Sequence, residues 1–146
     1  ENDELDGYFA NLWKAYRDET LQAGGTEDQA DANIAETKAE VFTNGVLNKE
    51  QHIFNVIYED RKVGFLWLVN RSHISSDDWY VYDIEIFEHE RQQGLGKATM
   101  TAAEEFVRNA GGKVLGLSVF GFNTAARKLY DSLGYETTRI QMKKDL

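Results

Sequence analysis

The chain has 146 residues, of which 42% are hydrophobic and 12% aromatic, and its formal net charge is −9. This length suits a single domain with one core, and the composition argues against an intrinsically disordered chain. The chain contains no cysteine, which excludes disulfides, a thiolate nucleophile and cysteine-based zinc sites. The lack of cysteine is also compatible with the reducing cytoplasm, where we expect the protein to be located.

Acidic side chains are concentrated in the first part of the chain. Residues 1–60 carry 14 acidic and 4 basic side chains, a sum of −10, whereas residues 61–146 carry 11 acidic and 12 basic ones, a sum of +1. Such a surface repels nucleic acid. No stretch approaches the roughly 20 apolar residues of a membrane span, and the three histidines have no metal-ligand spacing. We therefore expect a soluble protein without nucleic-acid, membrane or metal partners.

The N-terminal third of the chain has the pattern of two helices. Apolar residues, Tyr8 among them, recur at spacings of three and four over residues 5–16, which predicts a helix whose apolar face belongs to the core. Gly24-Gly25 predicts the end of that helix. Thr26 and Gln29 form a capping-box pattern that predicts the start of a second helix. Asn44-Gly45 predicts its end.

Strand-like patterns begin at residue 52. The predicted strands are 52–58, 63–69, 79–87, 114–120 and 135–142. The polar loop EDRK joins the first two strands into an antiparallel hairpin. A helix over Lys97 to Ala110 separates the third and fourth strands, and a helix capped by Asn123 separates the last two. This element order indicates a mixed α/β sheet.

The residues RQQGLG, at 91–96, lie between the third predicted strand and the helix that follows it. Gly94 and Gly96 lack Cβ atoms, so a ligand can approach the backbone amides closely, and the helix N-terminus favours an anion such as a pyrophosphate. A P-loop is excluded because Ala98 follows Lys97 where serine or threonine is required. A dinucleotide fingerprint is excluded because Thr99 replaces its third glycine.

The remaining pattern, RxxGxG between a strand and a helix, resembles the acyl-CoA motif of GCN5-related N-acetyltransferases (GNAT family). A second segment, NTAARKLYDSLGYE at 123–136, resembles the segment that follows the fifth strand in that family. The two motifs stand about thirty residues apart in the family's order, and the resemblance extends over nearly the whole chain.

The resemblance implies one GNAT-type domain over residues 1–146, α/β and α+β-like. Its central twisted sheet would be mostly antiparallel, with a parallel strand pair around the acyl-CoA site and helices on both faces. The family usually opens with a short strand before its first helix, whereas this chain starts almost at that helix. We therefore expect that this strand is missing or that another segment takes its place. Dimers are common in the family, and the sequence leaves the oligomeric state open.

The resemblance also implies a set of residues that bind acetyl-CoA. The Ile86 and Phe87 backbone would pair with the pantetheine amides, the amides of 92–97 would hold the pyrophosphate, and Asn123 would bond the pantetheine arm. Arg127 or Lys128 would meet the outer phosphate. The full implied set is Ile86, Phe87, Arg91, Gln92, Gln93, Gly94, Leu95, Gly96, Lys97, Asn123, Ala126, Arg127, Lys128 and Tyr130.

Direct acetyl transfer to an amine requires a base, an oxyanion stabiliser and an acid that protonates the leaving thiolate. Tyr130 is the candidate acid, although its helical spacing also suits a core residue. Glu85 is the candidate base, acting directly or through water, although a strand glutamate can be merely solvated and Asp83 shares its face. The backbone of Ile86 and Phe87 is the candidate oxyanion stabiliser.

The acceptor would be a small-molecule or peptide amine. The acidic N-terminal helices suggest that it is cationic and drawn by their field. The alternative is that the acids of the second helix, Asp28, Asp31, Glu36 and Glu40, form only a solvated face. A different functional class also remains open, in which a non-catalytic sensor or assembly module binds acyl-CoA with the same fold.

Overall fold

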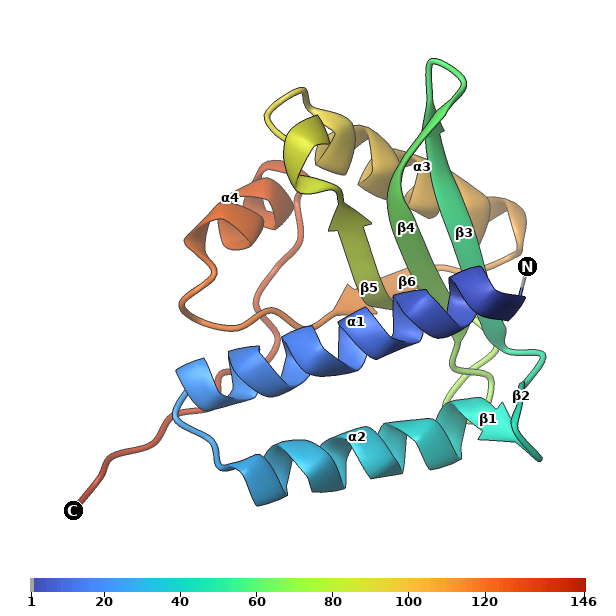
Figure 1. The fold of residues 1–146 in the computed structure, drawn as a ribbon. Coiled ribbons are helices and arrows are strands. Elements are labelled where there is room, and N and C mark those ends of the chain that lie inside the picture. Colours follow the sequence, from blue (N-terminus) through green and yellow to red (C-terminus); the bar gives the residue numbers. More distant parts are fainter. Residues whose placement is uncertain (1) are drawn as a thin grey trace.

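A computed structural model describes residues 2–146 and shows a mixed α/β chain (Figure 1). In chain order its elements are α1 (Asn2–Gln22), α2 (Glu27–Val41), β1 (Phe42–Thr43), β2 (Val46–Leu47), β3 (Gln51–Tyr58), β4 (Arg61–Asn70), β5 (Asp78–Ile86), the 3-10 helix η1 (Glu88–Glu90), α3 (Leu95–Asn109), β6 (Val114–Leu117) and α4 (Thr124–Ser132).

The main sheet has four strands in the order β3-β4-β5-β6. β3 pairs antiparallel with β4, β4 pairs antiparallel with β5, and β5 pairs parallel with β6. The predicted mostly antiparallel sheet with one parallel pair is therefore confirmed. β5 and β6 pair only from Asp78↔Val114 to Val81↔Leu117. Beyond Val81, the β6 side of β5 has no strand beside it in the described part of the chain.

Helices cover both faces of this sheet, as predicted. On one face α1 packs against alternate residues of β4, and α2 lies beside α1 (Figure 1). On the opposite face α3 packs on the intervening residues of β4 and on β5. The first cluster consists of Tyr8, Phe9, Val41, Phe65 and Trp67. The second consists of Leu66, Leu68, Trp79, Val81, Met100, Ala103 and Val107. Strand alternation thus divides β4 between two cores, which explains its continuous apolar sequence.

Local sequence signals account for most element boundaries. The Thr26 hydroxyl accepts from the Gln29 N–H and the Gln29 side chain accepts from the Thr26 N–H, so the predicted capping box is confirmed. The loop between β3 and β4 is shorter than EDRK: only Glu59 and Asp60 lie outside the strands, and both have positive φ, as a tight hairpin turn requires.

Two predicted element ends are wrong. α2 ends at Val41, and Asn44-Gly45 instead forms the turn of the short β1–β2 hairpin. The strand predicted at 114–120 ends at Leu117. In both cases the sequence pattern located a turn or strand, but the pairing partner decided how far it extended.

The strand predicted at 135–142 is also wrong, because this segment has no regular secondary structure. Its apolar residues Ile140 and Met142 are 73% and 88% exposed. Only Tyr135 packs against a core cluster. A strand needs a hydrogen-bonding neighbour, and this alternating segment has none among residues 2–146.

None of the helices within residues 2–146 has the length and apolar run needed to cross a bilayer. Across the same residues, no group of three or more histidine, aspartate or glutamate side chains is placed to hold a metal ion.

Candidate active site

A cavity of about 720 Å³ opens between α1, the end of β5, the glycine turn and α4. It lies where β5 loses its pairing with β6. The cavity thus brings together the two sequence motifs, which are distant in the chain. Its lining residues are Asn11, Leu12, Ala15, Glu19, Asp83, Ile84, Glu85, Ile86, Arg91, Gln92, Gly94, Leu95, Gly96, Asn123, Ala125, Ala126, Leu129 and Tyr130.

The glycine turn presents backbone amides to this cavity. Gly94 is the N-cap of α3 with φ 77°, in the left-handed region, and Gln92 has φ 63°. A Cβ at Gly94 would meet no atom within 4 Å, so the space above this amide is open. The first N–H groups of a helix have no partner within the helix. Leu95 and Gly96, which carry such groups, line the cavity. This geometry suits a pyrophosphate.

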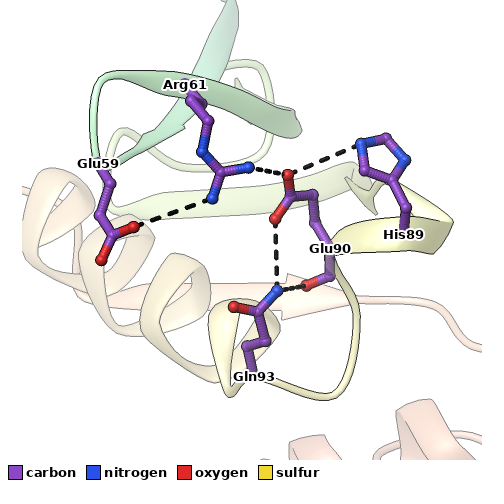
Figure 2. Close-up of polar contacts among 5 residues, drawn as sticks. All are labelled: Glu59, Arg61, His89, Glu90 and Gln93. Atoms are coloured by element: carbon purple, nitrogen blue, oxygen red, sulfur yellow. Dashed lines mark hydrogen bonds and ion pairs between the residues drawn. The ribbon is translucent and has the colours of Figure 1, made fainter.

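The buried carboxylate of Glu90 holds the turn in place through contacts with its neighbours (Figure 2). Glu90 is only 5% exposed, and its side chain pairs with Arg61 of β4. The Gln93 Nε2 group donates to the Glu90 carbonyl at 3.1 Å and to the Glu90 carboxylate at 3.3 Å. Gln93 was implied as a cofactor-binding residue, but its side chain is engaged by Glu90 and does not line the cavity.

At the end of β5, some backbone groups bond to β4 and others point away from it, toward the cavity. The Phe87 N–H donates to the Val63 carbonyl at 2.9 Å. In an antiparallel ladder successive residues point their N–H groups in opposite directions, so the Ile86 N–H points away from β4. The Ile86 carbonyl on that side accepts from the Arg91 Nε at 2.8 Å. Ile86 therefore has the free N–H, whereas that of Phe87 is bonded within the sheet.

Gly64 allows β4 and β5 to approach closely at this point. A Cβ on Gly64 would lie 1.9 Å from the Glu85 carbonyl oxygen. No side chain can be accommodated at this distance. Gly64 is the ladder partner of Ile86. The glycine thus positions the strand end that borders the cavity.

α4 contributes the second motif. The Asn123 Oδ1 atom accepts from the Ala126 N–H at 3.1 Å, which confirms Asn123 as the N-cap. This bond leaves the Asn123 Nδ2 group for a ligand. Among the implied phosphate partners, the Arg127 Nη1 donates to the Gly121 carbonyl at 3.2 Å, and neither Arg127, Lys128 nor Lys97 lines the cavity.

Tyr130 packs against the core and also borders the cavity. Its ring packs against the core cluster around Trp79 and lies 5.9 Å from the ring of Tyr135. The side chain also lines the cavity. Burial raises the pKa of the Tyr130 phenol, and the charge of Asp83 raises it further. The phenol is therefore protonated at neutral pH and can act as a proton donor.

Asp83 and Glu85 of β5 face α1. Asp83 pairs with Trp67 and Glu85 with Phe65 in the ladder, and both rings belong to the α1 cluster. Simple alternation along β5 would turn Tyr82 to the opposite face. A bulge at Tyr82, between Val81 and Asp83, breaks the alternation, so Tyr82 also turns to this side, with its ring 5.0 Å from that of Trp67.

Several cavity residues come from α1 and were missed by the sequence interpretation. Asn11, Ala15 and Glu19 line the cavity at spacings of four, beside the apolar stripe that was assigned to the core. Asn11 and Glu19, the polar members of this set, were a usable signal. None of the α2 acids lines the cavity, and Asp31 pairs with Arg17 instead. The acidic groups at the cavity are therefore Glu19, Asp83 and Glu85.

Comparisons with known proteins identify relatives of the chain. The sequence model of the acetyltransferase (GNAT) family matches residues 9–135. The uncharacterized N-acetyltransferase YycN of Bacillus subtilis is 28% identical over 151 residues, covering 100% of this chain and 95% of YycN. The crystal structure of YycN matches with a TM-score of 0.89 at 26% identity, over 100% of this chain and 94% of that chain.

Two other solved structures share the fold at lower identity. One is the aminoglycoside acetyltransferase meta-AAC0020, from an uncultured soil metagenomic sample, in complex with sisomicin. Its TM-score is 0.58 at 19% identity, over 77% of this chain and 74% of that chain. The other is a Bacillus anthracis protein assigned as a streptothricin acetyltransferase, in complex with acetyl coenzyme A. Its TM-score is 0.51 at 22% identity, over 60% of this chain and 49% of that chain.

Proposed function

Because the chain belongs to the acetyltransferase (GNAT) family, we propose that it is an N-acetyltransferase that moves the acetyl group of acetyl-CoA directly to a primary amine. The observation that carries this proposal is the single cavity bordered by the glycine turn, the end of β5 and Tyr130. The Bacillus anthracis neighbour in complex with acetyl coenzyme A supports the identity of the donor.

The donor binds along the side of the cavity formed by the turn and β5. The backbone amides of residues 92–97 hold the pyrophosphate at the N-terminus of α3. The pantetheine arm lies along the free side of β5, where the Asn123 Nδ2 group donates to it. Open space above Gly94 and the unpaired edge of β5 after Val81 support this placement.

The transfer needs no acylated enzyme. The chain has no cysteine. Ser118 hydrogen-bonds Tyr80 and lies outside the cavity lining. The acceptor nitrogen therefore attacks the thioester carbonyl itself: the C–N bond forms, the C–S bond breaks, and the amine loses a proton. The Ile86 N–H stabilises the oxyanion, and the Tyr130 hydroxyl gives its proton to the departing thiolate.

The acceptor is a cationic amine with at least one positive charge besides the reacting nitrogen. Three carboxylates line the cavity, from Glu19, Asp83 and Glu85. The basic side chain that lines it is Arg91, whose Nε is bonded to the Ile86 carbonyl. A negative cavity attracts a cation and orients it. The meta-AAC0020 neighbour, which is bound to the aminoglycoside sisomicin, supports an acceptor of this class.

Calorimetry with acetyl-CoA, followed by measurement of thiol release with cationic, neutral and anionic amines, tests the proposal. We expect binding, with release fastest for cationic amines. Binding without release for any amine would favour the non-catalytic acyl-CoA sensor or assembly module. No binding would reject acetyl-CoA as the donor, and a preference for neutral or anionic amines would reject the cationic acceptor.

A further inference from the structure

Tyr8 and Asp83 form a hydrogen-bonded pair at the wall of the cavity. The Tyr8 hydroxyl donates to the Asp83 Oδ2 at 2.7 Å, across 75 positions of the chain. Tyr8 is 3% exposed, and its ring stacks on that of Phe65 with centroids 4.3 Å apart. The pair therefore joins α1 rigidly to β5, and Asp83 lies at the cavity between this anchor and the reacting groups.

From this geometry we infer that Asp83, oriented by Tyr8, accepts the proton that the acceptor amine releases. The inference rests on the proposed acetyl transfer and assigns the base to Asp83 in place of Glu85. Both carboxylates line the cavity. Of the two, only Asp83 has a side-chain hydrogen bond to another element among residues 2–146, since its Oδ2 accepts from the Tyr8 hydroxyl.

The surroundings of Asp83 suit a proton acceptor. Burial raises the pKa of Asp83 to about 6, the charges of Glu85 and Glu19 act in the same direction, and the Tyr8 hydrogen bond acts against them. Tyr130 of α4 lines the same cavity as Asp83, and the Asp83 charge raises the pKa of its phenol. A base is most effective when its pKa approaches the working pH, so this environment strengthens Asp83 while leaving it ionised at neutral pH.

The proton balance closes with two residues. The amine proton moves to the Asp83 carboxylate as the C–N bond forms, and the Tyr130 proton moves to the thiolate as the C–S bond breaks. Asp83 then holds one proton more and Tyr130 one proton fewer than before. Proton transfer from Asp83 to Tyr130 through solvent in the cavity restores both. Two groups whose pKa values are held apart thus serve as base and acid.

Steady-state pH–rate profiles of thiol release in three variants test the assignment. Asp83→Asn preserves an acceptor for the Tyr8 hydroxyl but cannot take a proton. We expect a loss in kcat of about 10²-fold or more, loss of the acidic limb near pH 6, and unchanged acetyl-CoA affinity by calorimetry. Asp77→Asn is the matched control, because Asp77 is an exposed loop residue paired with Lys113.

Tyr8→Phe and Glu85→Gln should shift the acidic limb of the pH–rate profile, which a purely structural role would not do. Removal of the Tyr8 bond raises the pKa of Asp83 and moves the acidic limb to higher pH, because that bond lowers the pKa in the parent. Removal of the Glu85 charge moves the limb to lower pH. Tyr16→Phe, on the same helix but outside the cavity lining, should leave the limb in place.

An acidic limb that persists in Asp83→Asn but disappears in Glu85→Gln would overturn the assignment and return the base to Glu85, with acetyl transfer intact. Absence of thiol release by the parent protein with every amine would instead overturn the proposed function. Melting temperatures close to that of the parent show that each variant is folded.

Discussion

Arg61, at the start of β4, pairs with Glu90, the last residue of η1, and this contact fastens the glycine turn to the β3–β4 hairpin (Figure 2). The Glu90 side chain is 6% exposed and that of Arg61 52%. A carboxylate so deeply buried requires a partner. The turn whose amides we propose as the pyrophosphate site is thus held by Arg61, a residue that does not line the cavity.

We predict that Arg61→Ala lowers both stability and acetyl-CoA affinity. Loss of the partner leaves the buried Glu90 carboxylate with only Gln93 and His89 nearby, which should cost about 1–3 kcal/mol of unfolding free energy. Denaturant titration and calorimetry measure the two effects. Lys113→Ala, which breaks the exposed Lys113–Asp77 pair, should change stability by less than about 0.5 kcal/mol. Unchanged acetyl-CoA affinity in Arg61→Ala would show that the Arg61–Glu90 contact does not position the turn for acetyl-CoA binding.

Gly94→Ala should weaken acetyl-CoA binding by at least tenfold, because its methyl group would occupy the space above the amides that we propose to hold the pyrophosphate. Gly45→Ala is a matched control. Gly45 has the same φ of 77° and open space around its Cβ position, but it lies in the β1–β2 turn. Each variant should lose about 1 kcal/mol through strain at positive φ. Equal acetyl-CoA affinities for the two variants would contradict a phosphate site at Gly94.

Tyr130→Phe should keep acetyl-CoA affinity and lower kcat by about 10²-fold or more, because it removes the proton donor and little else. Calorimetry and thiol release report the two quantities. Tyr135→Phe is the control, since its ring packs against Tyr130 but does not line the cavity. Unchanged turnover in Tyr130→Phe would mean that the thiolate leaves unprotonated or takes its proton from water.

Titration of Asp83 should make the unfolding free energy decrease as the pH increases. Its pKa is 3.8 for an unperturbed side chain and about 6 in the folded state, so the folded state binds more protons between these values. The unfolding free energy then falls as the pH rises through that range, by on the order of 2 kcal/mol. Asp83→Asn should lack this fall in denaturation experiments at pH 4 and pH 7.

Asp77 is a control, because its titration changes the unfolding free energy with pH in the opposite direction. Its bond to Lys113 lowers the pKa of Asp77 in the folded state, so this pair contributes stability that is lost as the pH decreases. An identical pH dependence of stability in the parent and in Asp83→Asn would show that Asp83 does not titrate in this range.

The sequence by itself determined the features that depend on neighbouring residues. The capping box at Thr26 and Gln29, the N-cap at Asn123 and the β3–β4 hairpin all form where predicted. In each, a side chain or turn satisfies backbone groups a few residues away, so a short stretch of sequence contains all of the physical cause. The glycine turn at 91–96 is also local, and the structure brings it to the cavity.

The tertiary structure alone decided the features that depend on distant partners. The bulge at Tyr82 turned this residue to the α1 face against simple alternation. The segment 135–142 forms no strand because it has no pairing neighbour among residues 2–146. The contact of Tyr8 with Asp83 joins residues 75 positions apart. Periodicity assigned Tyr8 to the core, correctly, but could not reveal that its hydroxyl meets a carboxylate, because only the packing of α1 on β5 brings the two together.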